Sequence, residues 1–267
     1  YSFSNPLWHE TGHKTAFQSK FLNELFYYIS SYMANFEPTR WRYTHFIHHG
    51  NTYSTENPFD HEIEYGNNLK ETPKRLIINI IPFLDLVFFK KTKSFEIIQH
   101  ALAIKTKVMQ DSIPENAQAK VILNSRIYVA IWLAIILWSI SASSWMPLLY
   151  FVLPHFYGKT LVTLIAFTQH AGLARNIKDH RLTTREMYLN PILSFLYWKM
   201  EYHLTHHMFP TVPSYNLDKL HHHIKDQLPK PNDGLIDAYQ EIIPALIKQK
   251  EDTSYYIKKE LPEPQYI

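Results

Sequence analysis

The sequence contains no cysteine among its 267 residues, and it has only six glycines. The absence of cysteine excludes disulfides, cysteine-ligated zinc, iron–sulfur clusters, thiolate-bound haem and cysteine nucleophiles. No G-x-G-x-x-G or Walker-type run occurs, so the chain shows no glycine-rich loop for a dinucleotide or a nucleotide phosphate. A net charge of +3 is too small to predict binding to nucleic acid, so none is expected.

Charged residues are also missing from one long stretch of the chain. Residues 127–158 contain no Lys, Arg, Asp or Glu, which exceeds a single membrane span of about 20 residues. Ser141–Ser144 and Pro147 supply a break and a new helix start within it. We therefore expect a tight hairpin of two membrane-spanning helices, at about Val121–Ile140 and Trp145–Gln169. A buried helical hairpin in a soluble protein is the alternative.

Histidine is the residue that carries most information. Eight of the sixteen histidines fall in three short clusters, which are His9 and His13, then His45, His48 and His49, then His203, His206 and His207. On a helix, positions i, i+3 and i+4 share a face, so each cluster can direct its imidazoles the same way. Neutral imidazole binds iron, zinc and copper. Eight such ligands exceed the needs of one ion and predict two metal ions.

The order and spacing of these clusters resemble the histidine boxes of the membrane-bound fatty acid desaturase family, which includes related alkane and lipid hydroxylases. The resemblance extends beyond the histidines. Trp41-Arg42 leads into the second box, Thr168–Leu173 follows the last expected span, and Glu201–Pro210 surrounds the third box. It covers the chain from Trp8 to about His223.

The resemblance implies a non-haem diiron centre with two iron ions (Fe2+/Fe3+), and O2 as co-substrate. It also implies a separate electron donor of ferredoxin, rubredoxin or cytochrome b5 type with its reductase. The metal ligands carried over by position are His9, His13, His45, His48, His49, His203, His206 and His207. His170 follows the second expected span, where related enzymes place an additional ligand; a polar residue at the interface is the alternative. No separate catalytic residue and no other cofactor-binding residue is expected.

For the fold, we expect a single all-α domain over residues 1–267. Integral membrane helices would carry a cytoplasmic helical cap that holds the metal site, with an extended tail from about residue 251. Family members normally have two spans before the first box, so we expect a preceding pair to be missing from this chain. Basic residues flank both outer ends of the hairpin, which by the positive-inside rule places the histidine clusters on the cytoplasmic side.

Four further stretches have the apolar pattern of helices: residues 21–36, 76–89, 216–227 and 233–249. The second contains Pro82, which interrupts it. Several polar side chains close to the boxes are candidates to orient a ligating histidine: Glu10, Asn57, Asp60, Glu62, Glu64 and Glu201. The consecutive histidines 221–223 point three ways on a helix, so we expect them at the surface.

Together these patterns predict an oxidoreductase: an O2-dependent diiron oxidase that introduces a double bond into fatty acyl chains of lipids. A lipid or alkane hydroxylase of the same family is the alternative. His9–His13 also satisfies the H-E-x-x-H motif of zinc metalloproteases, with Glu10 as general base, but that leaves six clustered histidines unexplained. A soluble carboxylate diiron bundle needs E-x-x-H pairs from two helices, and only Glu10–His13 fits. A non-enzymatic membrane metal-binding protein is the remaining alternative.

Overall fold

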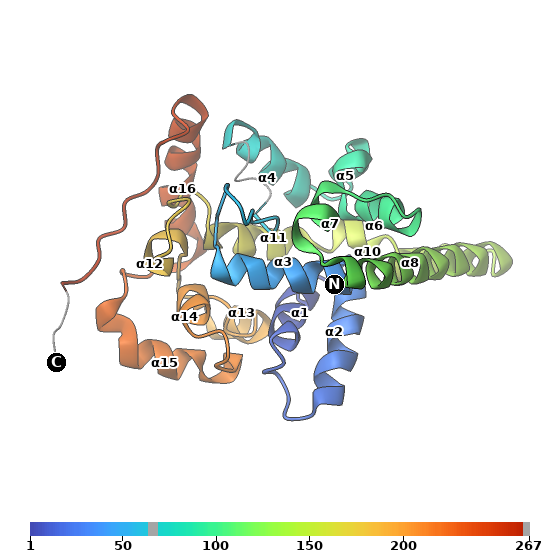
Figure 1. The fold of residues 1–267 in the computed structure, drawn as a ribbon, viewed down its shortest axis with the longest axis horizontal. Helices are drawn as coiled ribbons and strands as arrows, with labels where there is room; N and C mark the ends of the chain where they lie inside the picture. Colours follow the sequence, from blue (N-terminus) through green and yellow to red (C-terminus); the bar gives the residue numbers. More distant parts are fainter. Residues whose placement is uncertain (64–68, 264–267) are drawn as a thin grey trace.

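The computed structural model describes residues 1–63 and 69–263. These residues form helices joined by loops, and they contain no β-strand beyond a single bridge between Met187 and Asn232. The all-α fold expected from the sequence is therefore confirmed. Short helices pack into one body, and the long helix α8 (Glu115–Ser141) projects from it (Figure 1).

Three helices at the start of the chain surround one aromatic cluster. They are α1 (Ser4–Gly12), α2 (Lys20–Ala34) and α3 (Pro38–Gly50). The hydroxyl of Ser19 caps the first turn of α2, and the left-handed residue Asn35, with φ of 60°, ends it. The aromatic residues buried between these helices are Trp8, Tyr27, Phe36 and Trp41. This packing fixes α1 against α3.

Glu37 caps the N-terminus of α3. Its carboxylate accepts hydrogen bonds from the backbone N–H groups of Thr39 at 3.1 Å and Arg40 at 2.5 Å, and Pro38 occupies the first helical position. The side chain of Asn124 on α8 donates to the same carboxylate at 2.8 Å. Burial raises the pKa of Glu37 to about 7. The cap therefore also joins α3 to the projecting helix.

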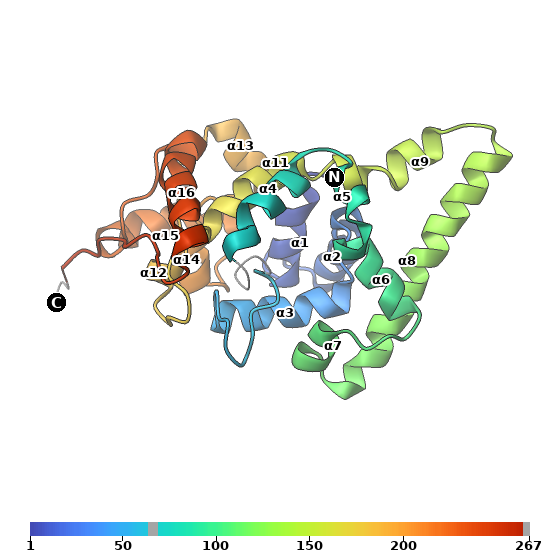
Figure 2. The ribbon, with the colours of Figure 1, turned by 90° about the horizontal axis from the view of Figure 1, so that it is seen from above.

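The first arm of the expected hairpin is confirmed as a continuous helix. At about 1.5 Å per residue, the 27 residues of α8 extend about 40 Å, enough for a hydrocarbon core of about 30 Å. Among the described residues, α8 alone is long and apolar enough to cross a membrane. Leu133, Leu137 and Ile140 on it are more than half exposed. The chain then reverses, and α9 (Met146–Phe151) returns beside the far end of α8 (Figure 2).

The second arm is not one helix, so the expectation of a single helix over Trp145–Gln169 is wrong. It consists of α9 (Met146–Phe151), α10 (Pro154–Tyr157), α11 (Thr160–Ala166) and the 3-10 turn η4 (Phe167–Gln169). Pro154 has no N–H with which to continue α9, and Gly158 ends α10. These breaks let α11 and η4 turn into the body of the molecule.

Short helices make up most of the remaining chain. In order, the other helical segments are η2 (Leu69–Glu71), α4 (Thr72–Ile80), α5 (Leu84–Val87), η3 (Phe89–Lys91), α6 (Lys93–Ala101), α7 (Lys107–Ser112), α12 (His180–Thr183), α13 (Pro191–Leu196), α14 (His203–Met208), η5 (Ser214–Asn216), α15 (Leu217–Ile224), η6 (Lys225–Gln227) and α16 (Gly234–Glu251). The helices expected over 21–36, 216–227 and 233–249 are confirmed. The stretch 76–89 breaks beside Pro82 into α4 and α5. After a turn at residues 253–254, residues 255–263 have no regular secondary structure.

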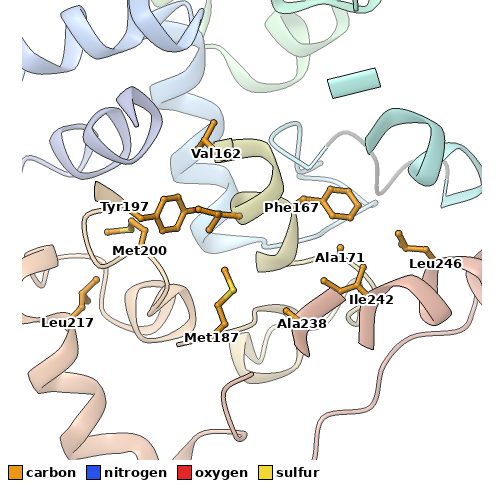
Figure 3. Packing of buried hydrophobic residues seen from close by; sticks show 11 residues of the cluster. Val162, Phe167, Ala171, Met187, Tyr197, Met200, Leu217, Ala238, Ile242 and Leu246 are labelled. Atoms are coloured by element: carbon orange, nitrogen blue, oxygen red, sulfur yellow. The ribbon is translucent and has the colours of Figure 1, made fainter. Parts of the chain in front are cut away.

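The main hydrophobic core joins α11 and η4 to α16. Figure 3 shows Phe167 and Ala171 facing Ile242 and Leu246, with Met187 beside them. Burying one such aliphatic side chain contributes about 1.5–3 kcal/mol. The core therefore holds η4, and with it the turn at His170, firmly against the C-terminal helix.

Candidate metal centre

Four segments carry the clustered histidines into the interior. His9 lies on α1 and His13 is its C-cap residue, His45, His48 and His49 lie on α3, His203, His206 and His207 lie on α14, and His170 directly follows η4. The i, i+3 and i+4 spacing turns the imidazoles of α3 and α14 to one side of each helix. The structure brings all nine of these side chains together.

The nine imidazoles form two groups. The first consists of His9, His13, His45, His49 and His206, and the second of His48, His170, His203 and His207. Within each group, one ring nitrogen per residue lies within 4.8 Å of all the others, and every residue except the partly exposed His13 is buried. The second and third boxes each contribute to both groups. Neither group therefore exists within a single helix.

Nitrogen spacing in the five-histidine group matches that around a metal ion. His13 Nε2 lies 2.8 Å from His45 Nε2 and 3.1 Å from His49 Nε2, while His206 Nε2 lies 3.2 Å from His13 Nε2. Two nitrogens bound at about 2.1 Å to one ion are about 3.0 Å apart at an octahedral edge and about 3.4 Å apart at a tetrahedral edge. The observed spacings fall close to this range.

The four-histidine group has the same spacing. His203 Nε2 lies 3.2 Å from His170 Nε2 and 3.1 Å from His207 Nε2. The ring of His48 packs edge-on against those of His170 and His207, with centroids 4.9 and 4.7 Å away. Both donor sets fit a metal ion by chemistry and by distance.

The surroundings keep most of these imidazoles in the neutral form that binds metal. Burial, reinforced for most of them by neighbouring imidazoles, lowers the pKa well below 6.5 for His9, His13, His49, His203, His206 and His207. The same causes lower the pKa of His170 to about 3. These rings therefore stay unprotonated, and the protein does not bear the energetic cost of burying several charged rings side by side.

The buried Asp60 and the partly buried Glu62 orient two histidines of α3. Asp60 Oδ2 accepts a hydrogen bond from His48 Nδ1 at 2.8 Å, and Glu62 Oε2 accepts one from His45 Nδ1 at 2.9 Å. Each bond holds a proton on Nδ1 and leaves Nε2 free for the group. Burial lowers the pKa of His48, but Asp60 and Glu62 outweigh it and raise that pKa to about 9. Burial likewise raises the pKa of Glu62, while His45 and His48 bring it down to about 2.

Uncharged oxygens serve the second group in the same way. The carbonyl of Thr183 accepts a hydrogen bond from His170 Nδ1 at 2.9 Å. The hydroxyl of Thr52 donates to the carbonyl of His48 at 2.7 Å and lies 3.1 Å from His207 Nδ1, from which it can accept. These contacts direct the Nε2 atoms of His170 and His207 toward their group.

A cavity of about 770 Å3 reaches both groups. His9, His48, His170 and His203 border it. Its apolar lining includes Trp8, Phe167, Tyr197 and Met200. Basic side chains border the same cavity, among them Arg75, Lys90, Lys91 and Lys107. The candidate metal centre is thus connected to a space with both apolar and cationic walls.

Comparison with known proteins agrees with this geometry. The family model of fatty acid desaturases matches residues 2–239. The chain belongs to the fatty acid desaturase family. It is 21% identical over 244 residues to a Delta(5) fatty acid desaturase of Caenorhabditis elegans, covering 79% of this chain and 51% of that protein. It is 20% identical over 263 residues to a Delta(6)-fatty-acid desaturase of the same organism, covering 87% and 58%.

The chain spans about half the length of these desaturase relatives, and no solved structure matches it. Family membership confirms the resemblance drawn from the histidine boxes. The family is membrane-bound, and α8 is a helix of suitable length and hydropathy.

Of the polar residues expected to orient ligating histidines, Asp60 and Glu62 contact histidines, whereas Glu10 and Glu201 do not. Glu10 accepts a hydrogen bond from the backbone N–H of Ser214 at 3.1 Å, because α1 turns its carboxyl away from the boxes. Glu201 is bound by the hydroxyl of Ser194. Asn57 is exposed, and Glu64 lies outside the described residues.

The histidine triplet also differs from expectation. His222 and His223 are exposed as predicted, but His221 is buried and its Nδ1 lies 2.9 Å from Glu186 Oε2. Successive helical residues are about 100° apart, so one of three must face inward when α15 packs on the body. Glu186 was not expected to have any role, because an isolated carboxylate far from the boxes carries no spacing signal.

Proposed function

We propose that this chain forms the catalytic domain of an O2-dependent non-haem diiron oxidase that introduces a double bond into fatty acyl chains of lipids. The convergence of nine imidazoles into two groups beside one cavity, in a member of this family, supports the proposal. The five-histidine group would hold one iron ion and the four-histidine group the other. When bound, the iron pair supplies the redox chemistry that activates O2 for attack on an unactivated C–H bond.

The protein's own groups prepare this centre. Asp60, Glu62 and the carbonyl of Thr183 hold protons on Nδ1 atoms, so that the opposite ring nitrogens face the metal sites. Burial keeps water away from the ligands. The lack of cysteine leaves no thiol beside the centre to be oxidised.

The cavity supports an acyl substrate. Its volume lies within the range of about 300–1,000 Å3 typical of small-molecule sites. Apolar side chains would stabilise the alkyl chain by about 0.8 kcal/mol for each buried methylene. Lys90 and Lys91 at the same cavity suit a carrier group with negative charge.

Electrons must come from elsewhere. Forming one double bond removes two hydrogen atoms from the acyl chain, and reducing O2 to two water molecules then takes two more electrons and two protons. We propose a separate donor of ferredoxin, rubredoxin or cytochrome b5 type, with its reductase. With α8 in the membrane, the histidine groups would face the cytoplasm, where such donors are available.

Hydroxylation is the alternative outcome at the same site, since a lipid or alkane hydroxylase would need the same donor set. Metalloprotease chemistry is not favoured. His9 and His13 share their group with three further imidazoles, and Glu10 is turned toward Ser214.

The test is to express the full-length protein, with a competent reductase, in a host that lacks desaturase activity, and to profile its lipids by mass spectrometry. Desaturation removes two hydrogens from an acyl chain, whereas hydroxylation adds one oxygen. His203→Ala should abolish the product, and His223→Ala, on the exposed face of α15, should retain it. Absence of both products from the wild-type lipids would refute the assigned substrate class.

A further inference from the structure

A short buried segment outside the histidine boxes contacts the turn that carries His170 and the helix α14. Together with α3, these two segments supply the four-histidine group. The five residues Thr183–Met187 are each no more than 4% exposed. They begin at the last residue of α12 and continue into the loop before α13, and Met187 inserts into the main core (Figure 3). We call residues 183–187 the strap.

Arg185 encloses the turn that carries His170. Its backbone N–H donates to the carbonyl of Gln169 at 2.7 Å, and its guanidinium donates to the carbonyls of Thr168 and, at 3.1 Å, Ala171. These three carbonyls flank His170 on both sides. The helical run of α11 and η4 ends immediately before His170, and the guanidinium of Arg185 holds the carbonyls on both sides of this end.

Glu186, the next residue, serves α14. Its Oε1 accepts hydrogen bonds from the backbone N–H of Thr205 at 2.8 Å and from the Thr205 hydroxyl. Thr205 lies in the first turn of α14, whose N–H groups have no partner within the helix, and the N-cap residue Tyr202 provides no side-chain cap. A helix of six residues is not stable alone. Glu186 therefore acts as a cap supplied from another segment.

Arg185 and Glu186 are each held by a side chain from a helix in the C-terminal part of the chain. Glu241 on α16 lies 3.2 Å from Arg185 Nε, and Lys259 in the tail lies 2.7 Å from Glu241. His221 on α15 lies 2.9 Å from Glu186. The strap is therefore fixed by the C-terminal part of the chain, with each buried charge paired.

We propose that the strap is a positioning element of the metal centre: Arg185 sets His170, and Glu186 sets the histidines of α14. The inference rests on the proposed function only in taking the two histidine groups as metal sites. Arg185 and Glu186 should therefore affect the two histidine groups differently. His170 belongs to the four-histidine group alone, whereas α14 supplies both groups.

The experiment measures metal binding, apart from activity. Purified full-length protein is titrated anaerobically with Fe2+, bound iron is counted by mass spectrometry, and visible absorption of the Co2+-loaded protein reports coordination. Arg185→Lys keeps the charge but loses the fork, so one of two metals should bind about 10–100-fold more weakly. Glu186→Gln should weaken both. The matched control is Arg181→Lys, in the partly exposed ion pair with Asp179.

Two tightly bound metals with unchanged Co2+ spectra in both strap variants would overturn the proposal. If thermal unfolding shows that Arg185→Lys does not fold, Glu241→Gln is tested instead. Glu241 is partly exposed and lies outside the strap, and the substitution removes the negative charge that pairs with Arg185. It should weaken one metal, and two unchanged metals would again refute the inference. Wild-type protein that binds fewer than two metals would refute both this inference and the diiron site. Wild-type protein that binds two but makes no lipid product refutes only the substrate.

Discussion

Replacing Asp60 by Asn is the most direct way to separate a carboxylate that tunes the metal centre from one that only packs. Asp60 is 1% exposed and its Oδ2 lies 2.8 Å from His48 Nδ1. Loss of a carboxylate behind a ligating histidine typically weakens metal binding 10–100-fold. At about 1.4 kcal/mol for each factor of ten, this is about 1.4–2.8 kcal/mol. The effect should fall on the four-histidine group, to which His48 belongs.

Competition between the protein and a chelator of known affinity, followed by iron counting, measures the change. Asp111→Asn is the matched control, because the exposed Asp111 makes a similar 2.9 Å contact with His61, which belongs to neither histidine group. The control should keep two tightly bound metals, while Asp60→Asn should keep one. Asp60 also accepts a hydrogen bond from the backbone of Tyr53 at 2.8 Å, so a small loss of thermal stability is expected as well. Equal affinities for both metals in wild type and Asp60→Asn would refute the reasoning.

Three further predictions concern stability and membrane insertion. Burial raises the pKa of Glu37 from 4.5 to about 7, so the stability contributed by its neutral form is present below about pH 4.5 and is lost as the pH rises through about 7. Between pH 5 and pH 8, the free energy of unfolding of the wild type should therefore fall by up to about 3 kcal/mol more than that of Glu37→Gln. Parallel pH profiles of the two proteins would contradict this. Ile242→Ala, at a fully buried core position, should cost about 2–5 kcal/mol in chemical denaturation, whereas Ile236→Ala, at an exposed position on the same helix, should cost under about 0.5. Leu133→Lys, on the exposed apolar side of α8, should make the apparent free energy of membrane insertion less favourable by about 3 kcal/mol in a glycosylation-mapping assay. Normal insertion of this variant would count against α8 as a span.

Local patterns predicted the helical class and the eight box histidines, whereas His170 was expected only from the family resemblance. The i, i+3 and i+4 spacing of box histidines requires only a few consecutive helical residues, so it can be interpreted without knowledge of the fold. The long apolar stretch similarly predicted α8 and the turn at its end. The second arm was mispredicted because average hydropathy does not register the backbone consequences of Pro154 and Gly158.

Contacts between distant segments could not be predicted in this way. Glu10 and Glu201 were the carboxylates nearest the boxes in sequence, yet Glu10 contacts Ser214 and Glu201 contacts Ser194. Glu186 is far from any box, yet it caps α14. In each case the direction of a side chain depends on how two elements pack.

The sequence alone determined which side chains are available for the chemistry. It supplied nine imidazoles, no thiol and one apolar helix of membrane length, because these are properties of composition and of short-range helical geometry. Only the tertiary structure decided that the imidazoles divide into groups of five and four, each drawing on more than one box. It also decided which oxygens face their outer nitrogens and that residues 183–187 hold two of the supporting segments. The grouping depends on segments more than 100 residues apart meeting in one packed interior. The other two features depend mainly on how segments 12–19 residues apart pack against each other there.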